Sequence, residues 1–442
     1  MSLALACLAL LPGGDWPQFR GPRGNGVVPA APMPRTWSET ENVAWKIAVP
    51  GHGWSQPIVV GDTLYVTTAI GPGSPRPLTY QAGVDAPDTS KDPVPAREID
   101  WRVVAYELAS GKERWQASAC KGQAKFQIHP SNTHAPETPA ADASGVYAYF
   151  GSTGTVAAFD TAGKERWKAE LGAYPTQDAF GTGSSPVLFG EKLFVQVFSE
   201  ERSFLVALDV KDGKEVWRVE RGLGTAWNTP VLWENVSAGG ARVELVASSK
   251  KHIASYDPTS GKELWTLAGI DTPDSSSPAW DAERLYFGFR GAKVNGPLYA
   301  LKAGASGVVT PKEGSRTLVG EAWQTALSAP GMPSPVSVNG QLFVLAGGFL
   351  SCFDAKTGIP RYKERLEGSG VVVASPIAVG DELVIVGESG KGFLVAAKPQ
   401  FEITGGGQLD EVLWATPTVA GGALFLRGVE HLYCLRASGS GG

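Results

Sequence analysis

Three segments decide the fold of this chain of 442 residues: A-F-D-T-A-G-K-E-R-W (158–167), A-L-D-V-K-D-G-K-E-V-W (207–217) and S-Y-D-P-T-S-G-K-E-L-W (255–265). Each begins with a small residue in a short apolar run and continues through an acidic residue and a glycine to a tryptophan. Aspartate can hydrogen-bond within its own turn, and glycine readily adopts a positive φ. Each segment therefore predicts two short strands joined by a tight turn.

The pattern recurs over almost the whole sequence. A small residue stands at the fixed place of the first strand at Ala105, Ala158, Ala207, Ser255, Ala300, Cys352, Ala396 and Cys434. A large aromatic residue belongs to the same pattern at Trp45, Trp115, Trp167, Trp217, Trp265, Trp323 and Tyr362. Small residues in register indicate close packing at that place, so we expect these aromatic side chains to be structural.

A second recurring element precedes each of these segments. It is a proline followed by apolar residues, a turn and an alternating strand, and it begins at Pro57, Pro139, Pro186, Pro230, Pro278, Pro335, Pro376 and Pro417. This is the pattern of a β-hairpin. The preceding residues are Gln56, Thr138, Ser185, Thr229, Ser277, Ser334, Ser375 and Thr416, whose side chains we expect to bond strand ends rather than ligands.

Four short strands in each unit of roughly 45 to 50 residues predict a β-propeller. The eighth unit ends after its third strand at Leu435, whereas Trp45 has no strands of its own before it. We therefore expect residues 42–49 to form the outer strand of the eighth blade and to close the ring. The prediction is one all-β domain over 15–437, an eight-bladed β-propeller of four-stranded antiparallel blades, followed by a flexible tail at 438–442.

Composition excludes several classes of function. Apolar residues make up 43% of the chain, charged residues make up 19%, the formal net charge is −5, and no run of Lys and Arg occurs. Nucleic acid and anionic membranes are therefore not expected partners. No stretch is long and apolar enough to predict a transmembrane segment. The short apolar run at 3–11 predicts a signal peptide at 1–14 and export to the periplasm or cell envelope, although a merely apolar or disordered N-terminus is the alternative.

The three quoted segments resemble the tryptophan-docking motif of quinoprotein-like propellers, which are built from PQQ-like repeats. The opening W-P-Q-F-R-G-P at 16–22 is similar to that of secreted bacterial members, so the resemblance covers nearly everything from Asp15 onward. It implies that the aromatic residues dock between adjacent blades. The family contains quinone-dependent dehydrogenases as well as non-enzymatic scaffolds, including BamB-like components of outer-membrane protein assembly, so the fold alone does not give the function.

The family's large dehydrogenases imply two adjacent cysteines over the quinone, a calcium site and a catalytic carboxylate. This chain has no adjacent cysteines: Cys352 and Cys434 occupy the small-residue place in separate blades, where structural thiols are expected, and Cys120 is expected in a loop. No catalytic residue is assigned. No cofactor is expected, and PQQ with calcium is the alternative.

Residues just before the repeat prolines should rim one mouth of the central channel. Trp54, Trp227 and Trp414 could form an aromatic collar, with Trp54 touching Trp414, or could simply pack at strand ends. Glu137, Asn228 and Asp274 form the only acid and amide set that resembles an oxygen-ligand cation site.

His129 and His134 lie in the loop H-P-S-N-T-H, where their spacing and lack of cysteine companions favour a loop role over zinc. We assign no metal site to them.

Long insertions at 71–100 and 116–134 should open on one face of the ring, where binding usually resides. An insertion at about 302–320 should open on the other face. The first hypothesis is a non-enzymatic, exported, monomeric scaffold that binds a protein or envelope polymer through the loop-bearing face, as the BamB-like resemblance suggests. The second is a PQQ-dependent dehydrogenase with an atypical site around Glu137, Asn228 and Asp274. The missing cysteine pair favours the first.

Overall fold

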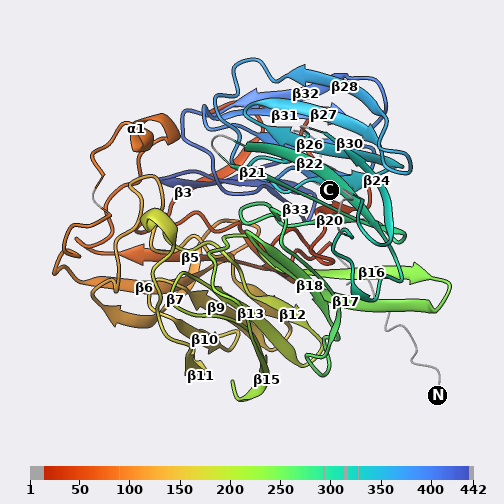
Figure 1. Cartoon of the computed structure of the whole chain (residues 1–442). Coiled ribbons are helices and arrows are strands. Elements are labelled where there is room, and N and C mark those ends of the chain that lie inside the picture. Colours follow the sequence, from red (N-terminus) through yellow and green to blue (C-terminus); the bar gives the residue numbers. More distant parts are fainter. Residues whose placement is uncertain (1–13, 89, 292–293, 313–316, 327, 438–442) are drawn as a thin grey trace.

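The computed structural model describes residues 14–88, 90–291, 294–312, 317–326 and 328–437. The regular secondary structure of these residues is almost entirely strand, arranged as eight antiparallel blades (Figure 1). The predicted eight-bladed β-propeller is confirmed. The proposed signal peptide, apart from Gly14, and the proposed tail at 438–442 lie outside the described residues.

Each blade follows the chain through four neighbouring strands. Blades 1 to 4 are β4 (Ile58–Val60), β5 (Thr63–Ile70), β6 (Ile99–Glu107) and β7 (Glu113–Gly122); β8 (Ala140–Asp142), β9 (Gly145–Phe150), β10 (Thr155–Phe159) and β11 (Glu165–Glu170); β12 (Val187–Phe189), β13 (Lys192–Phe198), β14 (Ser203–Asp209) and β15 (Glu215–Glu220); and β16 (Val231–Ser237), β17 (Gly240–Ser249), β18 (His252–Tyr256) and β19 (Glu263–Ala268).

Blades 5 to 8 are β20 (Ala279–Trp280), β21 (Arg284–Gly291), β22 (Val294–Lys302) and β24 (Glu321–Thr325); β25 (Val336–Val338), β26 (Gln341–Ala346), β27 (Phe349–Asp354) and β28 (Pro360–Arg365); β29 (Ile377–Val379), β30 (Glu382–Val386), β31 (Lys391–Ala396) and β32 (Ile403–Gln408); and β33 (Thr418–Ala420), β34 (Ala423–Arg427) and β35 (His431–Leu435) with β3 (Val43–Ala48).

Strand β3 completes the last blade as predicted, because it pairs antiparallel with β35. The seam between blades 8 and 1 is then fastened by side chains. Gln56 Nε2 donates to Pro417 O at 2.6 Å, and Thr418 Oγ1 donates to Pro57 O at 2.5 Å. The buried Arg427 of blade 8 donates from Nη1 to Thr67 O of blade 1 at 2.8 Å. The ring is therefore closed by strand pairing within blade 8 and by hydrogen bonds across the seam.

The hydroxyl residues before the repeat prolines form a ladder around the ring. The backbone N–H of each residue donates to the side-chain hydroxyl of the corresponding residue in the next blade. The order is Gln56 to Thr138, Thr138 to Ser185, Ser185 to Thr229, Thr229 to Ser277, Ser277 to Ser334, Ser334 to Ser375 and Ser375 to Thr416, at 2.9 to 3.2 Å between N and Oγ. The expectation that these side chains bond strand ends is confirmed. At the seam the Gln56 side chain makes the contact instead, through its amide N–H and Pro417 O.

Replacing Ser185 by Ala is expected to lower the free energy of unfolding by about 1–3 kcal/mol, because the buried N–H of Thr138 would lose its only acceptor in this ladder. Urea unfolding measures the loss. Ser185→Thr is the matched control and should stay close to wild type, since threonine performs the same task at Thr229. An equal loss in both variants would contradict the ladder's role.

The small residues and the aromatic residues of the repeat are cross-strand partners. Ala105, Ala158, Ala207, Ser255, Ala300, Cys352 and Cys434 lie opposite Trp115, Trp167, Trp217, Trp265, Trp323, Tyr362 and Trp45, respectively. The small side chain leaves room for the ring. Gly213 lies in a turn with φ of +73°, and a Cβ atom at this position would lie 2.4 Å from the Trp167 ring of the preceding blade. Glycine is therefore required both by the turn and by the close contact between the blades.

Five of the six repeat tryptophans donate from their indole N–H groups to the next blade. Trp45, Trp115, Trp167, Trp217 and Trp323 donate from Nε1 to the carbonyl oxygens of Leu108, Thr161, Val210, Pro258 and Ala355. Trp265 differs, because its Nε1 donates to Glu244 Oε2 in its own blade at 2.8 Å. Tyr362 instead makes an edge contact with Phe401 of blade 7, with ring centroids 5.5 Å apart.

Blade 7 departs from the repeat. The place that a small residue occupies in the third strand of the other blades is taken here by Leu394, and its partner in the outer strand is Gly405. The large and small partners have therefore exchanged strands. Ala396 does not occupy the place predicted for it. The short strand β2 (Thr36–Trp37) pairs parallel with β32 and places the buried Trp37 against Gly407, where a Cβ would lie 2.5 Å from the indole. An aromatic residue from the N-terminal segment therefore covers the blade that lacks its own.

Two further strands extend the sheets. Strand β1 (Val27–Val28) pairs parallel with β29 on the inner side of blade 7. Strand β23 (Gly307–Val308) comes from the blade 5 insertion and pairs parallel with β19 at the outer edge of blade 4. The hairpin of β16 and β17 projects beyond the neighbouring strands (Figure 1).

The N-terminal segment 15–28 crosses the inner strands of the ring. Trp16 exchanges both backbone hydrogen bonds with Val59 of blade 1, and Gly26 O accepts from Ala378 N of blade 7 at 2.7 Å. Asp15 Oδ1 accepts from Gly61 N, in the turn between the first two strands of blade 1. The segment therefore occupies the channel on the face of the short hairpin turns, opposite the long insertions.

We call the segment 15–28 the plug. Arg20 lies at its centre and is fully buried. Its Nη2 donates to the carbonyl oxygens of Asn25 and Pro335, and its backbone N–H donates to Gln56 Oε1. Burial lowers the pKa of Arg20 to about 9. The segment thus connects blades on opposite sides of the ring.

Candidate functional site

The loop-bearing face carries an insertion of blade 1 that includes α1 (Tyr80–Val84), the orange helix standing outside the strands in Figure 1. Arg76 pairs with Glu430 of blade 8, and Tyr80 N donates to Glu388 of blade 7. Leu78 N donates to Pro130 O at 2.9 Å. The insertion therefore reaches from blade 1 over two neighbouring blades and the connection to blade 2.

The bounds of both long connections differ from those expected. Strand β6 begins at Ile99, so the first insertion is 71–98 rather than 71–100. Strand β7 continues to Gly122, so the second connection is 123–139 rather than 116–134, and Cys120 lies in a strand, not in a loop. The extended pairing of β6 with β7 is the cause, since the two strands stay paired, with two register irregularities, as far as Ile99 and Gly122.

Trp54 and Trp414 lie at the mouth of the channel and stack on one another, with ring centroids 5.3 Å apart and an angle of 27° between planes. Trp54 Nε1 donates to Ser131 O at 2.9 Å, and Trp414 Nε1 donates to Glu388 Oε1 at 2.9 Å. Because Glu388 also accepts from Tyr80 N, the stacked pair and the α1 insertion are joined through one carboxylate.

Trp227 belongs to a separate aromatic cluster. Its ring meets Phe180 edge-on at 5.7 Å, and Phe180 lies 5.2 Å from the His129 ring. Trp227 Nε1 donates to Gly181 O. The three tryptophans therefore stand in two groups, one at the seam of blades 8 and 1 and one over blades 2 to 4.

The two histidines are held apart. His129 Nδ1 accepts from Ser131 N at 3.2 Å, which leaves the proton on Nε2. His134 is buried against the edge of Trp101, and burial lowers its pKa to about 4. Within the described residues no group of three or more His, Cys, Asp and Glu side chains could hold a metal ion.

Asn228 and Asp274 are joined by a backbone hydrogen bond, whereas Glu137 bonds to other residues, so the three do not converge. Glu137 Oε1 accepts from Gly151 N at 3.1 Å, and burial raises its pKa to about 7. Asp274 O accepts from the backbone N–H groups of Trp227 and Asn228, and burial raises the pKa of the Asp274 carboxyl. Gln196, which sequence reasoning did not single out, stands between the acid of blade 2 and the amide of blade 4.

The side chain of Asn228 is already occupied. Its Nδ2 donates to Ser248 Oγ and Pro273 O at 3.0 Å, and its Oδ1 accepts from Gln196 Nε2 at 3.3 Å. The Glu137 carboxyl is bonded as well, by Gly151 N and by the Thr182 side chain. The set therefore does not fit calcium as a converging group of free oxygen ligands.

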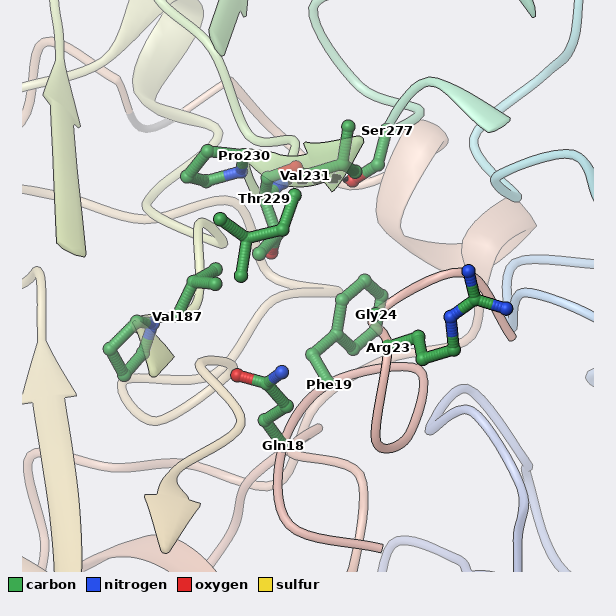
Figure 2. Close-up of a pocket in the computed structure, with 11 residues that line it drawn as sticks. Gln18, Phe19, Arg23, Gly24, Val187, Thr229, Pro230, Val231 and Ser277 are labelled. Carbon is green, nitrogen blue, oxygen red and sulfur yellow. Dashed lines mark hydrogen bonds between the residues drawn. The ribbon is translucent and has the colours of Figure 1, made fainter. Parts of the chain in front are cut away.

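Two small cavities lie beside the inner strands. The first, of about 10 Å³, is enclosed by the N-terminal segment and blades 3 to 5. Figure 2 shows Gln18 and Phe19 on the side opposite Val187 and residues 229–231, with the Arg23 side chain extending away from Val187. It has room for at most about one water molecule. Arg23 lies over the Trp280 ring at 4.8 Å and pairs with Glu234, so the plug is held by charge as well as by packing.

The second cavity, of about 20 Å³, lies between blades 2 and 3 on the loop-bearing side, under the connection that contains η1 (Gln177–Ala179). Its lining includes Tyr149, Tyr174, Thr176, Ser184 and Gln196.

Six of the twelve exposed large apolar side chains among the described residues lie on the loop-bearing face. The residues are Leu78, Tyr80, Val84, Phe180, Leu223 and Met332, each 36% to 63% exposed. They come from the α1 insertion and from three connections between an outer strand and the next inner strand. We call them the loop-face apolar set. Several apolar side chains on one face of a soluble protein mark an interaction surface more often than scattered single ones do.

No helix among the described residues is both long and apolar enough to cross a membrane.

Comparison with known proteins confirms the resemblance to quinoprotein-like β-propellers. Residues 152–317 match the model of a family described as outer membrane protein assembly factor BamB. No curated protein matches the chain by sequence.

Three solved structures have similar folds. BamB from Moraxella catarrhalis aligns with a TM-score of 0.57 and 14% identity, over 90% of this chain and 98% of that one. Quinohemoprotein alcohol dehydrogenase from Comamonas testosteroni aligns with a TM-score of 0.61 and 12% identity, over 97% and 82%. A quinohemoprotein alcohol dehydrogenase from Pseudomonas putida gives 0.60 and 11%, over 97% and 81%. Identities this low show the fold alone, and the fold is shared by an assembly factor and by enzymes.

Proposed function

We propose that this PQQ-like repeat propeller is a non-enzymatic, exported scaffold that binds a protein or an envelope polymer through its loop-bearing face. The observation that carries the proposal is the loop-face apolar set, which surrounds a face built from insertions on a rigid ring. The match to the BamB family model supports export and a binding role.

The chemistry of the face also favours binding over catalysis. The Trp54 and Trp414 indoles donate to Ser131 and Glu388, and the Asn228 amide is saturated. These polar groups hold the loops in place. The apolar side chains above them remain exposed and offer the buried core that a protein interface needs, with a polar rim around it.

A crosslinking experiment tests this proposal. A photoreactive side chain at position 180 or 223, in place of Phe180 or Leu223, is expected to give the same discrete adduct when the chain is expressed in its native cells. Val236 and Ile359 are matched controls, because they are similarly exposed but lie towards the opposite face, Val236 near the end of strand β16 and Ile359 in the turn before strand β28. Phe180→Glu and Leu223→Glu should reduce the adduct at the other position at least about tenfold, as expected for central interface residues. Equal adducts from both faces would contradict the proposal.

The rival function is PQQ-dependent oxidation, and titration of the purified chain with PQQ and calcium separates the two. Under the scaffold proposal, neither the absorbance of PQQ nor the melting temperature changes with cofactor in excess. Saturable binding with a raised melting temperature would overturn the proposal, and loss of that binding in Glu137→Gln would place the quinone beside the buried acid.

A further inference from the structure

The outer strand of each blade ends its sheet in an open edge, and charged side chains on an edge discourage pairing with another chain. Four of the outer strands carry a lysine or an arginine directly after the aromatic residue of the repeat. These residues are Lys46, Lys168, Arg218 and Lys363. Among the described residues, no further strand pairs with any of these four edges. The repeat therefore protects these four blades by charge.

Two outer strands lack this charge, and both are covered by another part of the chain. In blade 4, Thr266 follows Trp265 and faces Val308 of the added strand β23. In blade 7, Gly406 faces Thr36 of the added strand β2. Where the charge is missing, the edge therefore accepts a further strand.

The outer strand β7 of blade 1 also lacks the charge, but no strand of the described residues covers it. Gln116 follows Trp115, and the residues from Gln116 to Cys120 are all uncharged. Strand β7 has 10 residues, against 5 in β24 of blade 5, which shares both features. Every second residue of an edge strand points its backbone N–H and C=O groups away from the sheet. Strand β7 is therefore the longest outer edge that is open to pairing.

The sequence of β7 is complementary to itself when two copies run antiparallel. With Ala117 opposite Ala117 of the second copy, Glu113 lies opposite Lys121 at both ends of the paired strands, and Trp115 lies opposite Ala119. Opposite charges stabilise a cross-strand pair, and like charges directly opposite destabilise it. A parallel pair in register would place Glu113 opposite Glu113 and Lys121 opposite Lys121. The charges therefore favour the antiparallel arrangement.

We infer that this chain forms a twofold dimer in which β7 pairs antiparallel with β7 of a second copy, with Ala117 at the axis. The two four-stranded blades then form one continuous sheet. Such an interface is isologous, the commonest kind in soluble oligomers. It replaces the monomer expected from the sequence.

The dimer has a consequence for the loop-bearing face. Outer strands run between the two faces of the ring, so antiparallel pairing turns the loop-bearing faces of the two copies in opposite directions. Under the proposed function, the dimer holds one partner on each side. The pairing itself does not depend on that function, because β7 lies at the rim of the ring and leaves the loop-face apolar set free.

Sedimentation velocity of the purified chain over a range of concentrations tests the inference. A species of twice the chain's mass is expected at high concentration, with dissociation on dilution. Glu113→Lys places lysines opposite each other at both ends and should weaken the dimer about tenfold. The double variant Glu113→Lys, Lys121→Glu restores opposite charges and should recover the dimer. Glu165→Lys, at the same place of the E-R-W segment in blade 2, is the matched control and should leave the dimer unchanged.

A cysteine at the axis reports the register directly. Ala117→Cys places two thiols opposite each other, where the Cα atoms of paired strands are about 4.5–5.5 Å apart and within the reach of a disulfide. A mild oxidant should link this variant into a covalent dimer. The wild-type chain should not be linked, because its Cys120 faces Arg114 in this register. Gln324→Cys, in β24 of blade 5, is the control and should stay unlinked.

Two outcomes would overturn the inference. A chain that sediments as a monomer at every concentration does not pair through β7. A dimer that keeps its affinity in Glu113→Lys and is not linked through position 117 uses another surface. Circular dichroism of each variant separates loss of the dimer from loss of folding, and recovery in the double variant does so independently.

Discussion

Removing residues 15–38 is expected to abolish cooperative folding of the ring, although strand β3, which completes blade 8, is kept. Trp16 and Trp37 are almost completely buried. The loss of either side chain is comparable to a large core truncation, which lowers the free energy of unfolding by about 3–5 kcal/mol. Arg20 and strands β1 and β2 are lost with them. The sum approaches the whole stability of a typical domain, about 5–15 kcal/mol.

Circular dichroism during urea titration measures this effect. The full-length chain should unfold in a cooperative transition, and the truncated chain should show a shallow transition or none. Addition of a synthetic peptide of residues 15–38 should restore part of the transition, because the segment is held by backbone pairing with Val59 and Ala378 and needs no covalent link to fit. A truncated chain within about 1 kcal/mol of the full-length chain would show that the plug only decorates a ring already stable without it.

Trp217→Ala is expected to lower the free energy of unfolding by about 3–5 kcal/mol, as for other large aromatic truncations in a core. The indole lies opposite Ala207, stacks on Phe194 with centroids 5.6 Å apart, and donates from Nε1 to Pro258 O of blade 4 at 3.3 Å. Its loss opens a cavity within blade 3 and removes a contact to blade 4. Chemical denaturation measures both the midpoint and the slope.

A variant with a shortened 71–98 insertion serves as the comparison for Trp217→Ala. The ion pair of Arg76 in this insertion with Glu430 has both side chains more than 45% exposed, so it contributes at most about 1 kcal/mol to the free energy of unfolding. We expect little change in melting temperature from the shortening and a weaker partner signal. Equal destabilisation by both changes would contradict the division of the molecule into a scaffold and a binding face.

The repeat was readable because its determinants are close in sequence. A strand, a turn with glycine and a second strand form within about ten residues, and Ala207 faces Trp217 through that hairpin alone. The same logic identified the small-residue places in seven blades. It failed in blade 7, where Leu394 and Gly405 exchange the large and small roles, because the pattern assumes that the aromatic side chain comes from the blade itself.

The candidate site was predicted only in part. The contact of Trp54 with Trp414 followed from the adjacency of blades 8 and 1. The separation of Trp227 from that pair did not, because its neighbours Phe180 and His129 come from connections whose paths have no repeat. The contact of Gln196 with Asn228 could not be predicted from the sequence. A single amide in an apolar strand does not indicate its partner, because that partner lies in the next blade.

By itself, the sequence determined the number of blades, the strands within them, the turn glycines and the closing strand near Trp45, since these depend on short-range hydrogen bonding and on a period repeated eight times. Only the tertiary structure decided that residues 15–28 plug the channel, that Trp37 covers blade 7, that Tyr80 reaches Glu388, and that Phe180 lies beside Trp227. The physical reason is distance along the chain: these contacts join segments that no local propensity brings together, and they exist only once the ring has closed.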